Sequence, residues 1–144
     1  MHTVAEVLES KGRDVWWVSP ETSVLEALGT MAQRDIGALL VIEDGKLVGI
    51  FSERDYARKV VLTGRASRTT AVADVLTSRV LWVSPERTVE ECMALMTDKH
   101  IRHLPVLEEG RIIGLLSIGD IVRAVISQQK FIISELERYI TGVR

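Results

Sequence analysis

The sequence contains little of what small proteins use for covalent bracing or for membrane contact. Its 144 residues include one cysteine, Cys92, so no disulfide can form within the chain, and a reducing compartment is expected. Cys92 lies in a helical pattern, which favours a small buried apolar side chain over a reactive thiol. No apolar run approaches the roughly 20 residues needed to cross a bilayer. We therefore expect a cytoplasmic protein without a membrane partner.

Charge and catalytic motifs are sparse as well. The formal net charge of -2 provides no basic field for nucleic acid. His2, His100 and His103 lack metal-ligand spacing with cysteine or carboxylates. The chain has no phosphate-binding glycine loop, and Gly45 with Gly49 does not form a dinucleotide fingerprint. These absences predict a protein that is not an enzyme, holds no metal and does not bind nucleic acid.

The dominant positive feature is an internal repeat. Val18-Ser19-Pro20-Glu21 recurs as Val83-Ser84-Pro85-Glu86, and 83 minus 18 gives an offset of 65 residues. The same offset, without a gap, maps Gly45 to Gly110, Gly49 to Gly114, Ser52 to Ser117 and Asp55 to Asp120. Because chance would not hold register over this length, the chain contains two copies of one structural unit.

Each copy predicts the same order of elements: strand, helix, strand, strand, helix. The first strands are expected at 15–18 and 80–83, and each is followed by a proline and an amphipathic helix. Two apolar runs around Gly45, and two around Gly110, predict hairpins, and second helices begin at Ser52 and Ser117. A three-stranded unit of this size covers only one face of its sheet well, so two copies are expected to bury their apolar faces against each other. The fold class is therefore α/β (mixed α+β), with two pseudo-symmetric units packed sheet to sheet.

We expect the first domain at 1–63, a polar linker at 64–71, the second domain at 72–127 and a C-terminal helix at 128–144. Matching lead-in helices are expected at 4–8 and 72–76, with an offset of 68. In the C-terminal helix, one apolar stripe is formed by Phe131, Ile132, Leu136, Tyr139 and Ile140. This stripe packs either on its own domain or against a second copy or partner.

The repeat resembles the cystathionine-β-synthase-type (CBS) domain pair. The blocks that carry the resemblance are Gly49-Ile50-Phe51-Ser52-Glu53-Arg54-Asp55 and Gly114-Leu115-Leu116-Ser117-Ile118-Gly119-Asp120, with Ile101-Arg102-His103-Leu104-Pro105-Val106 added in the second copy. The chain is similar in particular to the stand-alone CBS proteins of bacteria and plant organelles.

The resemblance implies a regulatory ligand-sensing module. It implies two clefts between the repeats that hold an adenine nucleotide, AMP foremost, with ATP or NAD(H) as alternatives. It also implies a homodimer that signals through conformation or oligomer state. The alternative function is a protein-interaction scaffold that regulates a partner, such as the redox enzyme thioredoxin, without any nucleotide.

Ser-x-x-Asp directly after an apolar strand is a helix N-terminus. Ser117 can accept a bond from the first turn, and Asp120 can bond back or favour the helix dipole. The same geometry suits a ligand, because the positive helix end attracts phosphate and a carboxylate accepts ribose hydroxyls. Both interpretations hold together. The resemblance assigns the ribose to Asp120, and to Asp55 in the first copy.

The two copies differ before their central strands. The second has Arg102 and His103, which could close around a phosphate, where the first has Gly37 and Ala38. We therefore predict that the cleft marked by Ser117 is the better mononucleotide site.

The first copy offers Ser52 and Asp55, together with the cations Arg54, Arg58 and Lys59 in its second helix. These three cations could equally belong to a solvated helix face. The cleft of this copy is expected to be weaker or to take a different ligand. The resemblance implies that Trp17 and Val18, on the first strand, frame the adenine. Trp16 and Trp17 point to opposite faces of that strand, and a core or interface role is the alternative.

Overall fold

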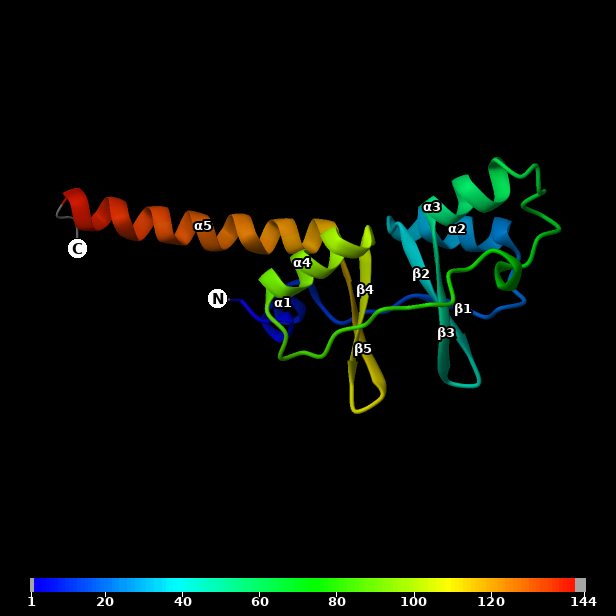
Figure 1. Cartoon of the computed structure of the whole chain (residues 1–144), viewed down its shortest axis with the longest axis horizontal. Coiled ribbons are helices and arrows are strands. Elements are labelled where there is room, and N and C mark those ends of the chain that lie inside the picture. Colours follow the sequence, from blue (N-terminus) through cyan, green and yellow to red (C-terminus); the bar gives the residue numbers. More distant parts are fainter. Residues whose placement is uncertain (1, 142–144) are drawn as a thin grey trace. The chain divides into compact units, whose positions relative to one another are not determined.

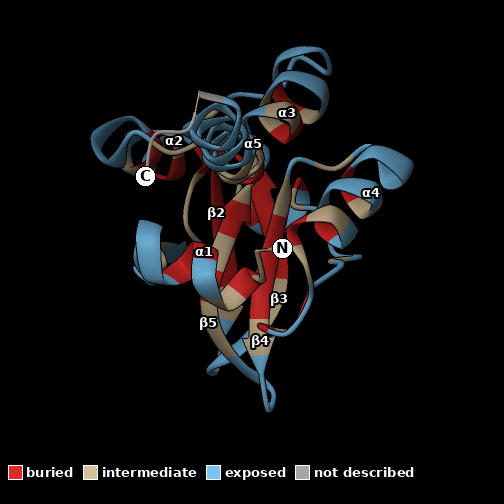
Figure 2. Ribbon diagram, turned by 90° about the vertical axis from the view of Figure 1, so that its left-hand side faces the viewer, coloured by how far each residue is buried: buried red, intermediate tan, exposed pale blue. Residues whose placement is uncertain are grey.

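The computed structural model describes residues 2–141 of the chain (Figure 1). It divides into two compact units: unit 1 comprises Met1–Asp14 and Leu81–Arg144, and unit 2 comprises Val15–Val80. Each unit contains one sheet and its own apolar core. Buried residues concentrate on the strands and on one side of most helices, as Figure 2 shows. The mixed α+β class is thus confirmed.

Unit 2 contains the first copy of the repeat. Its elements are β1 (Trp17–Val18), α2 (Val24–Arg34), β2 (Ala38–Glu43), β3 (Lys46–Ser52), α3 (Glu53–Asp55), a π-helical turn η1 (Tyr56–Val61) and a 3-10 turn η2 (Val72–Asp74). The strand order is β1-β2-β3, with β1 parallel to β2 and β2 antiparallel to β3. The lead-in helix predicted at 72–76 is therefore a shorter 3-10 turn.

Unit 1 contains the second copy. Its elements are α1 (Val4–Lys11), α4 (Val89–Lys99), β4 (His103–Glu108), β5 (Arg111–Ser117) and α5 (Ile118–Thr141). The β4-β5 hairpin repeats the β2-β3 hairpin down to a bulge at the aligned position, between Val41 and Ile42 in one unit and between Val106 and Leu107 in the other. The expected C-terminal helix is present as the continuation of α5 rather than as a separate element.

The prediction of a strand at 80–83 is wrong, because this segment forms only one isolated bridge, between Val83 and Val106. In unit 2 the corresponding pairing includes a bond from the Leu40 amide to the Trp16 carbonyl at 3.2 Å. The residue aligned with Leu40 is Pro105, which has no amide proton to donate. Proline thus removes one rung of the ladder and leaves a two-stranded sheet with a single bridge.

Each unit is completed by the segment that precedes the other copy in sequence. In unit 1, the Val4 amide donates to the Arg87 carbonyl at 2.8 Å and the Val89 amide donates to the His2 carbonyl at 2.9 Å. In unit 2, the Val24 amide donates to the Thr70 carbonyl at 2.9 Å. Apolar side chains of both lead-in segments, Val4, Val7 and Leu8 in one and Val72 and Val75 in the other, enter the respective cores.

The repeated strand glycines permit this packing. A Cβ on Gly114 would lie 2.6 Å from a methyl carbon of Leu8 in α1. A Cβ on Gly49 would lie 2.7 Å from both Leu76 Cδ1 and the Thr77 carbonyl oxygen. At Gly49 the clash with backbone excludes a side chain, whereas at Gly114 the buried Leu8 side chain would have to shift to admit one.

Gly49→Ala is therefore expected to destabilise the protein by about 1–3 kcal/mol, since the backbone carbonyl of Thr77 must move to admit the methyl group. Gly29→Ala in α2 is the matched control: its added methyl meets nothing within 4 Å, and alanine stabilises a helix interior by about 0.5–1 kcal/mol. Urea unfolding of both variants gives the comparison. Equal stability of the two variants would contradict the close-packing account.

Candidate functional site

The N-terminus of α5 is built by a reciprocal pair of hydrogen bonds between Ser117 and Asp120. The Asp120 amide donates to Ser117 Oγ at 3.2 Å, and the Ser117 amide donates to Asp120 Oδ2 at 2.8 Å. The strand β5 therefore ends and the helix begins at one residue, because both orphan donors are satisfied locally. The capping interpretation of Ser-x-x-Asp is confirmed here.

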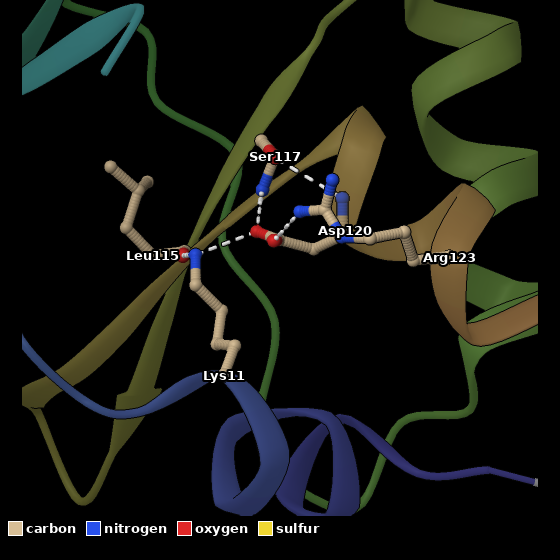
Figure 3. Close-up of polar contacts among 5 residues, drawn as sticks. All are labelled: Lys11, Leu115, Ser117, Asp120 and Arg123. Atoms are coloured by element: carbon tan, nitrogen blue, oxygen red, sulfur yellow. Dashed lines mark hydrogen bonds and ion pairs between the residues drawn. The ribbon is translucent and has the colours of Figure 1, made fainter. Parts of the chain in front are cut away.

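Asp120 also accepts from two cations, as Figure 3 shows. Lys11 Nζ, from α1, donates to Asp120 Oδ2 at 2.6 Å and to the Leu115 carbonyl at 2.7 Å. Arg123 Nη2 donates to Asp120 Oδ1 at 2.6 Å. Asp120 is 6% exposed, whereas the Arg123 side chain is 73% exposed. Oδ2 is thus held inside the unit by Lys11, and Oδ1 is bonded to the long, exposed side chain of Arg123 at the surface.

These contacts keep Asp120 ionised. Burial is the largest single influence and by itself raises the pKa of the carboxyl group. The hydrogen bond from Lys11, the bonds from Ser117 and the charge of Lys11 together outweigh burial, so the pKa of Asp120 lies below its ordinary value. A negatively charged acceptor is therefore in place at neutral pH without any ligand.

Unit 2 contains the corresponding arrangement at Asp55, which is also 6% exposed. The Ser52 amide donates to Asp55 Oδ2 at 3.0 Å, and the Asp55 amide donates to Ser52 Oγ at 3.2 Å. Thr77 Oγ1 donates to Asp55 Oδ1 at 2.9 Å, and Lys59 Nζ lies 3.0 Å from the same oxygen. Lys59 also donates to the Leu76 carbonyl at 3.2 Å, as Lys11 does to Leu115.

The two sites differ in what holds the outer carboxylate oxygen. At Asp55 this oxygen has a hydroxyl and a lysine, with the hydroxyl coming from the lead-in segment. At Asp120 the outer oxygen accepts from the exposed guanidinium of Arg123. The outer oxygen of Asp55 therefore has a donor from another segment of the chain, whereas that of Asp120 is bonded from within its own helix.

Arg102 and His103 lie beside the Asp120 site. The Ile118 amide donates to the Arg102 carbonyl at 2.8 Å, so the residue before β4 helps to fix the first turn of α5. His103 is paired with Ser117 across the hairpin. The first copy repeats this arrangement with Gly37, whose carbonyl accepts from the Glu53 amide at 3.0 Å. The structure thus brings Ser117, Asp120, Arg102 and His103 together at one end of the β4-β5 hairpin.

The remaining predicted residues lie in unit 2. Val18 is buried in the core, and Trp17 is 56% exposed on the same short strand. Trp16 packs against the core, and the Arg34 guanidinium lies 4.0 Å from its ring centroid. Arg54 follows Ser52 in the first turn of α3. Among the two tryptophans, Trp17 is therefore the one available to a ligand, whereas Trp16 is structural.

Sequence reasoning did not assign Lys11, Arg123 or Thr77 to these sites. Arg123 lies one helical turn after Asp120, so the sequence spacing alone could have predicted this ion pair. Lys11 lies 109 residues from Asp120 in sequence, and its approach depends on the exchange of the lead-in segments. Thr77 depends on the same exchange.

Residues 2–141 also bear on metal binding, thiol chemistry and membrane crossing. No group of three or more histidine, cysteine, aspartate or glutamate side chains there could hold a metal ion. Cys92 is buried, and burial raises the pKa of its thiol to about 11, so it is an unreactive apolar residue as predicted. No helix in the described part of the chain has the length and hydropathy that a bilayer crossing requires.

Comparison with known proteins gives consistent matches. The family model of the CBS domain matches residues 4–62 and 72–127. The CBS domain-containing protein CBSX3, mitochondrial, of Arabidopsis thaliana is 40% identical over 149 residues, which cover 97% of this chain and 72% of the relative. The solved structure of a protein with CBS domains from Burkholderia ambifaria MC40-6 has a TM-score of 0.86 and 48% identity, covering 88% of this chain and 96% of that one.

A more distant structure is the CBS domain pair of protein MJ0100 in complex with 5′-methylthioadenosine and S-adenosyl-L-methionine. It has a TM-score of 0.79 and 22% identity, covering 89% of this chain and 98% of that one. At this identity the likeness shows the fold alone.

Asp120→Asn tests the electrostatics of the site. Asparagine keeps an oxygen for the Ser117 amide but removes the charge that Lys11 and Arg123 hold, so unfolding free energy at neutral pH should fall by about 1–2 kcal/mol. Because the folded pKa of Asp120 is lowered, its contribution is fully present above the ordinary aspartate pKa and disappears as pH falls through the lowered value.

The difference between wild type and Asp120→Asn should therefore shrink over that acidic range in urea unfolding. Asp98→Asn is the control, since the Asp98 side chain is 75% exposed beside Lys99 and should change stability by less than about 0.5 kcal/mol. A wild-type advantage that stays constant down to the lowest pH would contradict the assignment.

Proposed function

The chain belongs to the CBS domain family, and from that premise we propose that it is a regulatory module that senses an adenosine ligand, AMP foremost. Paired CBS domains are regulatory ligand-binding modules, and the matched family is not a catalytic one. The proposed ligand binds beside Ser117 and Asp120, with Arg102 and His103 at its phosphate. ATP and NAD(H) are the alternative ligands.

The observation that carries the proposal is the state of the Asp120 carboxylate. It is buried and ionised, and it lies in the first turn of α5 with an exposed arginine on its outer oxygen. The two hydroxyls of a ribose can replace the Arg123 contact and form charge-assisted hydrogen bonds. Because no proton has to be removed from Asp120 at neutral pH, the acceptor is ready before the ligand arrives.

The phosphate contact rests on charge and on backbone geometry. The Arg102 carbonyl is bonded to the first turn of α5, so the Arg102 side chain starts from a fixed backbone position beside the positive end of the helix. His103 follows it on β4, opposite Ser117. Arg102, His103 and the N-terminus of α5 together provide a suitable site for one phosphate group.

We propose a weaker second site at Asp55, formed with Ser52, Arg54, Trp17 and Val18. Lys59 and Thr77 already occupy the outer oxygen of Asp55. Gly37 in place of Arg102 removes one cation but leaves room for a larger ligand. Exposed Trp17 offers a flat apolar surface to an adenine ring.

The comparisons support the ligand class only in general terms. One CBS pair of this fold, from protein MJ0100, holds two adenosine compounds. Both matched regions, 4–62 and 72–127, are CBS domains, and we propose that a ligand acts through the homodimer or a separate protein. Such a ligand shifts an equilibrium only by its differential affinity for the two states. The cytoplasmic location stays a prediction, since one relative is mitochondrial by name.

A second candidate is a scaffold that regulates a partner protein, such as thioredoxin, without nucleotide. The observation that favours it is that both carboxylates are already satisfied within their own units. Ser-x-x-Asp would then be purely structural. Capture of the partner that is unchanged by added AMP, ATP or NAD would favour the scaffold.

Thermal unfolding with AMP, ADP, ATP, NAD, NADH and S-adenosylmethionine in turn tests the sensor. A ligand at 100 times its dissociation constant adds roughly 2.7 kcal/mol of stability, which raises the midpoint clearly. Asp120→Ala should abolish the AMP-dependent shift while its ligand-free form remains folded. Asp55→Ala is the matched control and should retain most of the shift. A shift of wild-type size in Asp120→Ala would refute the site.

Arg102→Ala separates the phosphate from the nucleoside. Removal of a charge-assisted contact should weaken AMP about 10-fold or more and leave adenosine within about 2-fold. Calorimetric titration of both compounds measures the two constants. Arg111→Ala is the control, because this exposed arginine lies in the β4-β5 turn region, at the opposite end of β5 from Ser117. Equal losses for AMP and adenosine would contradict the phosphate assignment.

A further inference from the structure

The second half of α5 does not pack against any other described element of unit 1. Residues near its start pack well: Ile121 is fully buried, and Ala124 and Val125 contact the core. From residue 129 to residue 140, every side chain is exposed. Figure 1 shows this half extending away from α1, α4 and the β4-β5 hairpin of the same unit. We call residues 129–140 the tail helix.

The apolar residues of α5 follow a coiled-coil repeat. A seam with alternating steps of four and three residues runs through Ile118, Val122, Val125, Gln129, Ile132, Leu136 and Tyr139. Val125 packs against the core of unit 1, so the part of the seam that a second helix can cover begins at Gln129. Beside the seam, a second row at seven-residue steps contains Ile126, Ile133 and Ile140. Phe131 was predicted to share this face, but with 3.6 residues per turn it lies on the opposite side of the helix.

The apolar part of the tail helix is large enough for a weak, concentration-dependent contact. Five of its apolar side chains, Ile132, Ile133, Leu136, Tyr139 and Ile140, are between 50% and 85% exposed. Together they carry on the order of 300 Å² of apolar area, taking roughly 60–120 Å² for a full side chain. Since about 65% of a homodimer interface is apolar, this corresponds to roughly 450 Å² per copy. The total of about 900 Å² lies in the range of weak, transient interfaces.

The charges of the tail helix select the partner. Lys130 and Arg138 balance Glu135 and Glu137, and Arg138 Nη1 donates to Glu135 Oε1 at 3.1 Å. A neutral apolar surface offers no attraction to a strongly charged protein or nucleic acid, and two copies of it do not repel. A seam with a seven-residue repeat requires a helix with the same repeat, which a second copy of this chain always supplies.

We propose that the tail helix is a self-association surface that pairs with the tail helix of a second copy of this chain through the seam at Ile132, Leu136 and Tyr139. Gln129 is the one polar residue in the seam and fixes the register of the pair at some expense of stability. The tail lies beyond the residue range matched by the family model, which ends at 127. The interface is thus an addition to the CBS pair and does not rest on the ligand proposal.

Sedimentation equilibrium of the full chain without nucleotide tests the pairing. Leu136→Glu should weaken self-association about 100-fold or more, since both copies lose an apolar side chain and bury a charge. Phe131→Glu is the matched control, because it removes an exposed large apolar residue of the tail helix and adds the same charge. Since Phe131 lies outside the seam, the association constant should stay unchanged. Circular dichroism should show both variants folded.

Several results would overturn the proposal. Equal association constants for the two variants would place the dimer contact elsewhere. A monomeric wild type whose melting midpoint falls in Leu136→Glu, independent of concentration, would show that the tail packs on its own chain. Because these measurements use no ligand, their failure is distinguishable from a failure of AMP binding.

Discussion

The carboxylate of Asp120 connects the junction of β5 and α5 with Lys11 of α1, which lies 109 residues away in sequence. Burying an ionised group is unfavourable unless cations and amide donors surround it. Here the donors come from the end of β5, from α5 itself and from Lys11 at the end of α1. The docking of α1 in unit 1 therefore completes this site, and Gly114 leaves the space in which Leu8 crosses β5. The exchange of lead-in segments thus contributes directly to the geometry of the site.

The same constraint, met by different residues, makes the two sites unequal. In unit 2 the lead-in segment supplies the hydroxyl of Thr77, and the lysine comes from the π-helical turn η1 instead. The outer oxygen of Asp55 is consequently more firmly held than that of Asp120. Pro105 adds a second difference, because it reduces the first strand of unit 1 to a bridge. The duplicated sequence thus holds one outer oxygen by an arginine of its own helix and the other by a lysine and a threonine hydroxyl.

The repeat made much of this readable in advance. The offset of 65 residues aligned the hairpins, the glycines and both Ser-x-x-Asp sequences, and each of these forms the same local structure twice. Local hydrogen bonding explains the success, since a cap needs only residues within one turn. Two of the contacts that escaped prediction span long separations, Lys11 with Asp120 and Thr77 with Asp55, whereas the contact of Arg123 with Asp120 is local. Periodicity fixes which face of an element is apolar, but it does not say which lead-in segment covers it.

The most direct test of the central claim is a crystal structure of the protein grown with AMP. The account predicts both ribose hydroxyls within about 2.6–3.0 Å of the Asp120 carboxylate. It also predicts the Arg123 guanidinium displaced from Oδ1, the Lys11 bond retained and the phosphate beside Arg102. AMP bound elsewhere, with Lys11, Asp120 and Arg123 arranged as they are without ligand, would contradict it.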